Sequence, residues 1–225
     1  MRYKTESLHN QVNNFFHFDN MGFIDVSIPD KLFKSLKKEC DVALDSNDEK
    51  VSGLSGVGVP THRYLKNKHN LQELEILILN LLKEYKIKFE LDPLQAEFVN
   101  AQPTFVWDKP WINYQKKNEF LPTHIHDGIF SYTIWIDIPY DSYEELKEGG
   151  GHASCFHFHY TDILGKSREH LIRLSKRDNG RMLFFPAKLS HQVYPFYTTD
   201  KYRVSISGNV MLDIKFNDGQ RRELW

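Results

Sequence analysis

The sequence has few cysteines, and this scarcity argues against two kinds of architecture. Only Cys40 and Cys155 are present among 225 residues, far apart in the chain and without a CxxC pair. A disulfide framework or a thiolate zinc site needs more cysteines at closer spacing. We therefore expect neither of them, and we expect a reducing, cytoplasmic setting.

The sequence also lacks long apolar runs and any excess of one charge. No apolar run approaches the ~20 residues of a membrane-spanning helix, and the opening stretch MRYKTESLHNQ does not have the pattern of a secretory signal. The 29 basic and 30 acidic residues leave a net charge of -1. This balance gives no electrostatic case for binding nucleic acid or an anionic membrane, so we expect neither as a partner.

Apolar and aromatic residues are plentiful, at 40% and 14% of the chain. This composition predicts a folded protein with a substantial core, which we expect to be a single domain spanning residues 1–225. Residues 1–95 predict a helical support. Apolar residues recur at helical spacing from Leu32 to Leu44, with Asp30 as the expected N-cap, and again over 71–85. A strand is expected over 23–28.

From about residue 96 the pattern changes to short β-like runs separated by Pro, Gly, Asn and Asp. Strands of this length and spacing predict a sandwich or barrel, of which the jelly roll is one form. The fold class is therefore mainly β with α (α+β), with N-terminal helices laid against a β core. The expected strands are 98–101, 104–107, 111–115, 131–138, 154–160, 181–186 and 201–213.

The stretch from Gly180 to Asn209, GRMLFFPAKLSHQVYPFYTTDKYRVSISGN, combines a buried strand, a bend and a second, alternating strand. In the second strand Arg203, Ser205 and Ser207 share one face. An arginine in the middle of a buried strand is costly unless an anion meets it, so this face predicts a carboxylate site. His191 follows the first strand and can turn towards the same space.

A second informative segment, PTHIHDG, lies between two expected strands. Side chains at i and i+2 of an extended chain share a face, so His124 and His126 can reach one point while Asp127 points away. With His191, three imidazoles converge, a ligand set that suits a metal with open coordination positions. The alternative is that His124 and His126 are exposed loop residues without a ligand.

Taken together, these segments resemble a known family. The phrases NEFLPTHIHDGIFSYTIWIDIP, FHFHYTDILG and GRMLFFPAKLSHQVYPFYTTDKYRVSISGN resemble 2-oxoglutarate- and Fe(II)-dependent dioxygenases. They are most similar to a branch of small enzymes from bacteriophages and marine bacteria, which would place a phage-encoded member in the host cytoplasm. The resemblance spans about residues 113–210 and is weaker over residues 1–95.

The resemblance implies a double-stranded β-helix core, the cupin-like form of the jelly roll, over residues 96–225. It implies Fe(II) as the metal, 2-oxoglutarate as cosubstrate, dioxygen as second substrate, and an unidentified prime substrate. Hydroxylation with release of succinate and carbon dioxide is the expected reaction. Iron would be held by His124, His126 and His191 as the catalytic centre. The cosubstrate would be bound by Arg203, Ser205 and Tyr114.

One position departs from the usual His-x-Asp pattern of these dioxygenases. The second position is His126, so either three histidines hold the metal or Asp127 replaces His126. Strand geometry favours His126. A neutral ligand in place of a carboxylate leaves the iron site one charge more positive, which bears on the outcome of the reaction.

His157 and His159 form a second i, i+2 pair in SCFHFHY. The sequence places no third ligand beside them, so we expect them to line the site or a solvated face. Two other functions remain open at this point: a cupin-like metal enzyme that does not use 2-oxoglutarate, and a non-catalytic jelly-roll protein that binds a partner or belongs to a virion. The sequence names neither the prime substrate nor the oligomeric state.

Overall fold

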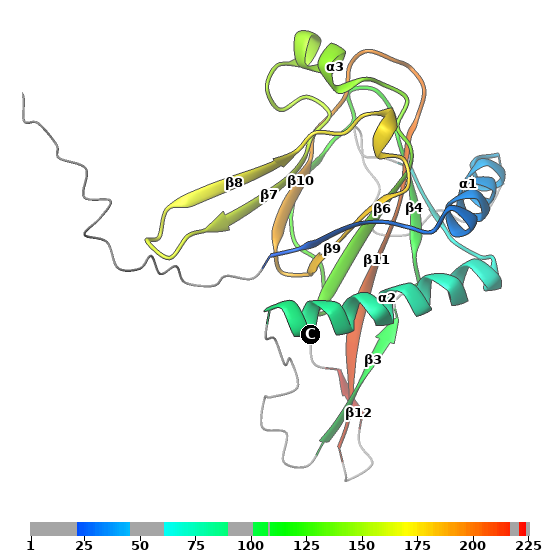
Figure 1. Cartoon of the computed structure of the whole chain (residues 1–225), viewed down its shortest axis with the longest axis vertical. Coiled ribbons are helices and arrows are strands. Elements are labelled where there is room, and N and C mark those ends of the chain that lie inside the picture. Colours follow the sequence, from blue (N-terminus) through cyan, green and yellow to red (C-terminus); the bar gives the residue numbers. More distant parts are fainter. Residues whose placement is uncertain (1–21, 46–60, 90–100, 108, 217–220, 224–225) are drawn as a thin grey trace, which may run out of the picture.

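The computed structural model describes residues 22–45, 61–89, 101–107, 109–216 and 221–223, which form two antiparallel sheets and the helices around them (Figure 1). The larger sheet has the strand order β1–β9–β6–β11–β4–β2, with β3 and β12 also paired to β11. Its strands are β1 (Ile24–Ser27), β2 (Thr61–Tyr64), β3 (Ala101–Trp107), β4 (Trp111–Gln115), β6 (Phe130–Asp137), β9 (Arg181–Pro186), β11 (Arg203–Phe216) and β12 (Arg221–Glu223).

The smaller sheet has the order β5–β10–β7–β8. Its strands are β5 (Leu121–His124), β10 (Ser190–Val193), β7 (Phe156–Thr161) and β8 (Ser167–Ile172). The two sheets share an apolar layer to which both contribute aromatic residues, among them Trp135, Phe156, Phe158 and Phe185. Aromatic side chains bury large apolar areas, so this layer holds the sheets together.

Both faces of the larger sheet are buried, and alternate residues along a strand pack on opposite faces. In β9, Leu183 and Phe185 face the smaller sheet, whereas Met182 and Phe184 belong to a separate cluster on the other side. A strand that is buried on both faces reads as a continuous apolar run, and RMLFFP is such a run.

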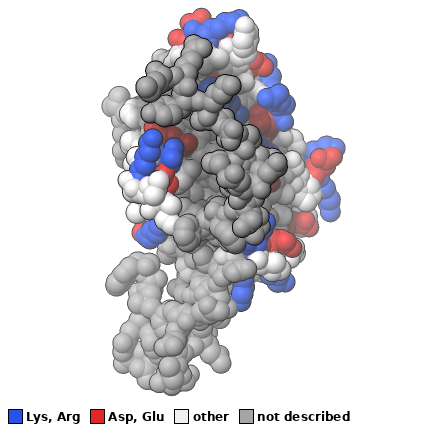
Figure 2. Space-filling view, turned by 60° about the vertical axis from the view of Figure 1, so that its left-hand side comes forward, with Lys and Arg blue, Asp and Glu red and all other residues white. Residues whose placement is uncertain are grey.

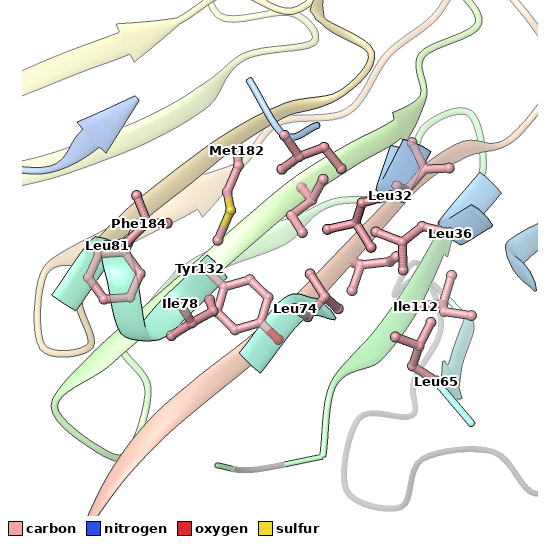
Figure 3. Close-up of a cluster of buried hydrophobic side chains, with 14 of the residues drawn as sticks. Leu32, Leu36, Leu65, Leu74, Ile78, Leu81, Ile112, Tyr132, Met182 and Phe184 are labelled. Atoms are coloured by element: carbon pink, nitrogen blue, oxygen red, sulfur yellow. The ribbon is translucent and has the colours of Figure 1, made fainter. Parts of the chain in front are cut away.

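Two helices cover the outer face of the larger sheet (Figures 1 and 3). They are α1 (Asp30–Leu44) and α2 (Lys68–Phe89). The buried face of α1 presents Leu32, Leu36 and Cys40 at helical spacing. The buried face of α2 presents Leu74, Ile78, Leu81, Leu82 and Tyr85. Figure 3 shows several of these side chains against Ile112, Tyr132, Met182 and Phe184 of the sheet.

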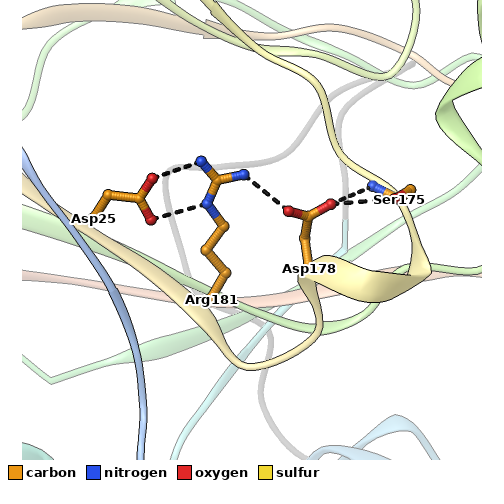
Figure 4. Close-up of polar contacts among 4 residues, drawn as sticks. All are labelled: Asp25, Ser175, Asp178 and Arg181. Carbon is orange, nitrogen blue, oxygen red and sulfur yellow. Dashed lines mark hydrogen bonds and ion pairs between the residues drawn. The ribbon is translucent and has the colours of Figure 1, made fainter.

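One arginine fixes the edge strand β1 to the rest of the sheet (Figure 4). Arg181 of β9 donates from Nε and Nη2 to both carboxylate oxygens of Asp25, at 2.9 and 2.6 Å. Its Nη1 donates to Asp178 at 2.9 Å, and Asp178 in turn accepts from the backbone N–H and the hydroxyl of Ser175. This chain of contacts joins β1 to the turn η2 (Lys176–Asp178) that leads into β9.

Both predicted helices are present, as are the predicted strands at β1, β4, β6, β7, β9 and β11, and the mainly β fold class is confirmed. The predicted run 98–101 lies outside the described residues except for its last residue. The predicted N-cap is displaced by one residue, since Pro29 precedes α1 and Asp30 is its first residue. Before residue 95 the chain supplies strands β1 and β2 to the larger sheet as well as helices.

Charges of both signs are interspersed on the face shown in Figure 2, where acidic and basic side chains lie beside one another. This distribution agrees with the near-zero net charge of the chain. Among the described residues, no helix has the length and apolar character needed to cross a membrane.

Candidate functional site

Three histidines from separate points of the chain meet at one place between the sheets. His124 at the end of β5 and His191 on β10 are direct cross-strand partners, with ring centroids 4.3 Å apart. His126, in the loop after β5, lies 5.1 Å from the His124 ring and 5.0 Å from the His191 ring. One ring nitrogen of each lies within 4.8 Å of the other two. The structure thus brings together the three histidines predicted from the sequence.

Backbone carbonyls two residues upstream orient two of the rings. Nδ1 of His124 lies 2.6 Å from the carbonyl oxygen of Pro122, and Nδ1 of His191 lies 2.9 Å from that of Leu189. A ring that donates from Nδ1 presents the lone pair of Nε2 in the opposite direction, which is the arrangement found in metal-bound histidines. The third ring is positioned through its backbone, because the His126 N–H donates to the carbonyl of Ala187 at 2.9 Å.

Two of the rings, those of His126 and His191, are held in their neutral, metal-binding form. Burial is the main reason that the pKa of His191 falls to about 3 and that of His126 to about 4, and the neighbouring His124 adds to both effects. His191 is 2% exposed and is stacked on Phe156, with Phe185 of the opposite sheet 5.0 Å from its ring. At physiological pH these two imidazoles are therefore unprotonated and able to bind a metal.

The spacing of the nitrogens also suits one shared ion. Nε2 of His191 lies 3.2 Å from Nε2 of His126. Two nitrogens bound at about 2.1 Å and at right angles to one another lie about 3 Å apart. The donor set of this cluster therefore fits a divalent transition metal such as Fe(II), with further coordination positions left open.

Of the two residues considered for the second ligand position, only His126 lies in the cluster. The Asp127 side chain is 85% exposed, and its carboxylate is 3.8 Å from Nζ of Lys188 on the surface. The alternation expected for an extended HxHD segment is therefore observed.

Arg203 lies on the face of β11 that looks toward the smaller sheet and is 2% exposed. Its Nε donates to Oε1 of Gln115 at 3.0 Å, and Nη2 donates to the same oxygen. The remaining donors reach Tyr140 Oη at 2.7 Å, the Ser154 carbonyl at 3.0 Å and the Tyr194 carbonyl at 2.8 Å. All of these partners are neutral. Among the described residues no carboxylate pairs with this buried cation.

A row of polar side chains continues from Arg203 along the same face of β11. Ser205 and Ser207 both accept hydrogen bonds from the Asn113 amide, at 3.1 and 3.0 Å, and both remain partly exposed. Further along, Asn209 accepts from the Ser131 hydroxyl at 2.8 Å. Polar groups accessible to solvent between two sheets indicate a space that can receive a polar ligand.

The structure contradicts the cosubstrate contact expected of Tyr114. Its neighbours Asn113 and Gln115 on β4 face the smaller sheet, so Tyr114 points to the helix side. There it is 1% exposed and its hydroxyl donates to the Cys40 carbonyl of α1 at 2.6 Å. Tyr114 lies on the same strand as Asn113 and Gln115, but the alternation of side chains along β4 places it in the core.

The expectation for His157 also needs correction, because this residue is neither solvated nor part of the histidine cluster. It is 0% exposed and lies on the face of β7 opposite Phe156 and Phe158, which pack between the sheets. His157 therefore belongs to a different environment from His191.

Gln115, Asn113 and Tyr140 are site residues that the sequence reasoning missed. The sequence did contain a signal for the first two, since WINYQ is a predicted strand in which Asn113 and Gln115 must share a face. Nothing in the sequence marks Tyr140, which reaches Arg203 from the segment between β6 and α3 (Ser142–Gly149).

Comparison with known proteins agrees with this geometry. Residues 109–209 match the family model described as "Putative 2OG-Fe(II) oxygenase", a segment that contains all three histidines and Arg203. No curated protein matches the chain. A prolyl-4-hydroxylase from Pseudomonas putida is similar in structure, with a TM-score of 0.56 at 14% identity, over 85% of this chain and 92% of that one.

Two further solved structures share the fold. The viral collagen prolyl hydroxylase of Paramecium Bursaria Chlorella virus-1, solved with 2-oxoglutarate, has a TM-score of 0.51 at 11% identity, over 84% of this chain and 94% of that one. The epimerase SnoN from nogalamycin biosynthesis, solved with Fe3+ and α-ketoglutarate, has a TM-score of 0.53 at 15% identity, over 86% and 81%. At these identities the likeness establishes the double-stranded β-helix fold.

Proposed function

We propose that the chain is a 2-oxoglutarate- and Fe(II)-dependent oxygenase, which the family match over residues 109–209 supports, and that it hydroxylates a prime substrate at a centre held by His124, His126 and His191. Arg203 and Ser205 bind the far carboxylate of 2-oxoglutarate. One observation carries the assignment: three imidazoles converge within 4.8 Å in the same interior that holds a buried arginine without a carboxylate partner among the described residues. The family match does not favour a non-catalytic role or a cupin-like enzyme without 2-oxoglutarate.

The three histidines bind the metal and leave part of its coordination sphere free. Fe(II), when bound, supplies the redox chemistry with dioxygen in which 2-oxoglutarate becomes succinate and carbon dioxide and the substrate is oxidised. The protein contributes orientation, through the carbonyls of Pro122 and Leu189, and exclusion of water, through Phe156 and Phe185 beside His191.

Charge balance in this interior supports an anionic cosubstrate. Three neutral ligands leave the two positive charges of Fe(II) uncompensated, and Arg203 adds a third buried positive charge. Uncompensated charges between two sheets are strongly unfavourable. A dianion such as 2-oxoglutarate compensates two of the three charges, with one carboxylate at each end of a short carbon chain.

Gln115 accepts hydrogen bonds from the two Arg203 donors that a carboxylate would need. The Gln115 oxygen accepts from both Nε and Nη2, the pair of donors that binds a carboxylate in a bidentate manner. Cosubstrate binding therefore replaces this amide oxygen with a charged oxygen pair. Ser205, two residues along the same face, supplies a hydroxyl beside the arginine.

An anaerobic titration of metal-free protein with Fe(II) and 2-oxoglutarate tests the proposal, with the visible charge-transfer absorption of the iron–2-oxoglutarate chelate as the readout. The wild-type protein is expected to develop the band. His191→Ala is expected to lose it, and Arg203→Met to need a far higher 2-oxoglutarate concentration. Lys188→Ala, which alters only the surface partner of Asp127, serves as the control and is expected to behave as wild type.

The outcomes separate the proposal from its alternatives. Iron binding without the band in the wild-type protein would indicate a metal enzyme that does not use 2-oxoglutarate. Absence of iron binding would mean that the histidine cluster is structural. A band retained in His191→Ala would show that the ligand set is wrong.

A further inference from the structure

We propose that the chain carries a second metal site, formed by His152, His157 and Glu169 on the outer face of the smaller sheet, and that it takes a divalent ion of the zinc class. One ring nitrogen of each histidine and one carboxylate oxygen lie within 4.8 Å of one another. The three residues come from three segments: the loop after α3, strand β7 and strand β8.

The distances within this group are those of ligands around an ion, and they are too long for good direct hydrogen bonds. Nε2 of His157 lies 3.5 Å from Oε2 of Glu169, and Nε2 of His152 lies 3.8 Å from the same oxygen. Ligand atoms bound tetrahedrally to zinc at about 2.1 Å lie roughly 3.3 to 3.5 Å apart. A small closing movement of exposed side chains would bring the three ligands to this spacing.

The state of His157 is an independent sign that a ligand belongs here. Its side chain is 0% exposed, and within the described part of the chain neither ring nitrogen makes a hydrogen bond. Buried polar atoms are nearly always satisfied, so each exception requires a partner. Burial also lowers the pKa of His157, which keeps the ring neutral and able to bind a metal.

Neighbouring rings hold His157 and His152 in place. The His152 ring is stacked on Tyr194 at 5.1 Å, and the His157 ring is 5.4 Å from His152 and 5.6 Å from Tyr194. Two imidazoles and one carboxylate are a known zinc ligand set, and they leave a fourth position for water. Glu169 and His152 are about half exposed, so an ion can enter from solvent.

This site is distinct from the histidine cluster between the sheets. Alternation along β7 places Phe156 and Phe158 inward, against His191, and His157 outward. The two sites nevertheless share a structural connection. His152 is two residues from Ser154, whose carbonyl accepts a hydrogen bond from Arg203. An ion bound to His152 therefore ties the loop that contacts Arg203 to the β7–β8 hairpin.

The site can be tested by measuring the zinc stoichiometry of metal-free protein in competition with a chromophoric chelator. The wild-type protein is expected to bind two equivalents of Zn2+. Glu169→Gln and His191→Ala are each expected to bind one equivalent, and the double variant none at the same affinity. The Kd for Zn2+ at the altered site should rise by at least about tenfold. Glu148→Gln, an exposed glutamate of α3, is the matched control.

Glu169 is chosen because its exposed position makes misfolding a poor explanation for lost binding, and His152→Gln provides a second variant of the same kind. Two equivalents retained in both Glu169→Gln and His152→Gln would overturn the proposal. So would a wild-type protein that binds one equivalent, lost in His191→Ala. If the His191→Ala variant still binds one equivalent of Zn2+, and the Glu169→Gln variant binds one equivalent fewer than the wild-type protein, the second site is confirmed. This result does not depend on whether the interior cluster also binds zinc.

Discussion

Arg203 is held by a glutamine in the way that a carboxylate would hold it. Gln115 accepts from two of its donors, and Tyr140, Ser154 and Tyr194 accept from the others. The guanidinium is thus fixed in orientation before any ligand arrives. Preorganisation of this kind reduces the entropy that binding must otherwise cost.

Removal of Gln115 is expected to separate stability from ligand binding. Gln115→Ala leaves two donors of a buried cation without their acceptor, which costs about 1–3 kcal/mol and lowers the Tm of the free protein. The same change frees the donors for 2-oxoglutarate, so the rise in Tm on adding the cosubstrate should exceed that of the wild type. Thermal unfolding with and without 2-oxoglutarate measures both. Gln192→Ala, on the outer face, is the control.

The pKa values of His126 and His191 imply a pH dependence of stability in the metal-free protein. Both pKa values are lowered from 6.5, to about 4 and about 3, so below pH 6.5 the unfolded chain binds more protons than the folded one. Stability is therefore complete above about pH 7 and falls as pH drops towards 4. For buried His191 the slope approaches about 1.4 kcal/mol per pH unit between the two pKa values.

Urea unfolding between pH 4.5 and 7.5, in the presence of a chelator, measures this slope. Carboxylates also titrate in part of this range, so the comparison is with His191→Gln, which lacks the titrating ring. The variant is expected to show a shallower dependence on pH. Equal slopes for the two proteins would contradict the assignment of a lowered pKa to His191.

At the scale of elements, α2 shows how the helical layer contributes stability. Leu74 packs against the sheet and is 0% exposed, whereas Ile76, two residues later and on the opposite face of the same helix, is 60% exposed. Leu74→Ala is expected to cost about 2–5 kcal/mol of unfolding free energy because it opens a cavity in the core. Ile76→Ala is expected to change stability by no more than about 0.5 kcal/mol. Chemical denaturation of both variants provides the comparison.

The elements that the sequence predicted are those with a regular apolar pattern. The strands at WINYQ and RMLFFP were predicted with their observed bounds, because they are buried on both sides. The strands β5, β8 and β10 were missed because they are short or polar, as in LPTH and SREHLI. The site followed the same rule. His124, His126 and His191 were predicted, whereas Tyr140, Ser154 and Tyr194 reach Arg203 through a tertiary arrangement that no local pattern encodes.

At the scale of the whole molecule, the metal and the cosubstrate are expected to stabilise the fold together. In the metal-free protein, ring nitrogens of three histidines face one another in the same interior as Arg203, which has no carboxylate partner in the part of the chain that the structure describes. Binding of the metal and of 2-oxoglutarate supplies both sets of groups with partners. With Mn2+ and 2-oxoglutarate each at about 100 times Kd, linkage adds about 2.7 kcal/mol per ligand, and each kcal/mol raises the Tm of a chain of this size by about 2–4 °C.

Differential scanning calorimetry with each ligand alone and with both gives the test. The joint shift should exceed the sum of the single shifts, since each ligand compensates charge or lone pairs near the other. The excess should disappear in Arg203→Met. A joint shift equal to the sum in the wild type would mean that the two ligands do not share one site.

Strand β11 has a consequence for how such a protein can change over generations. The side chains of Arg203, Ser205, Ser207 and Asn209 face the smaller sheet, while the residues between them face the helices. Loss or gain of one residue in this strand would exchange the residues on its two faces, and would place the arginine among the apolar side chains between the larger sheet and the helices. Heritable change in this strand is therefore confined to substitutions, and variation in length must accumulate in connections such as 149–151 and 162–166.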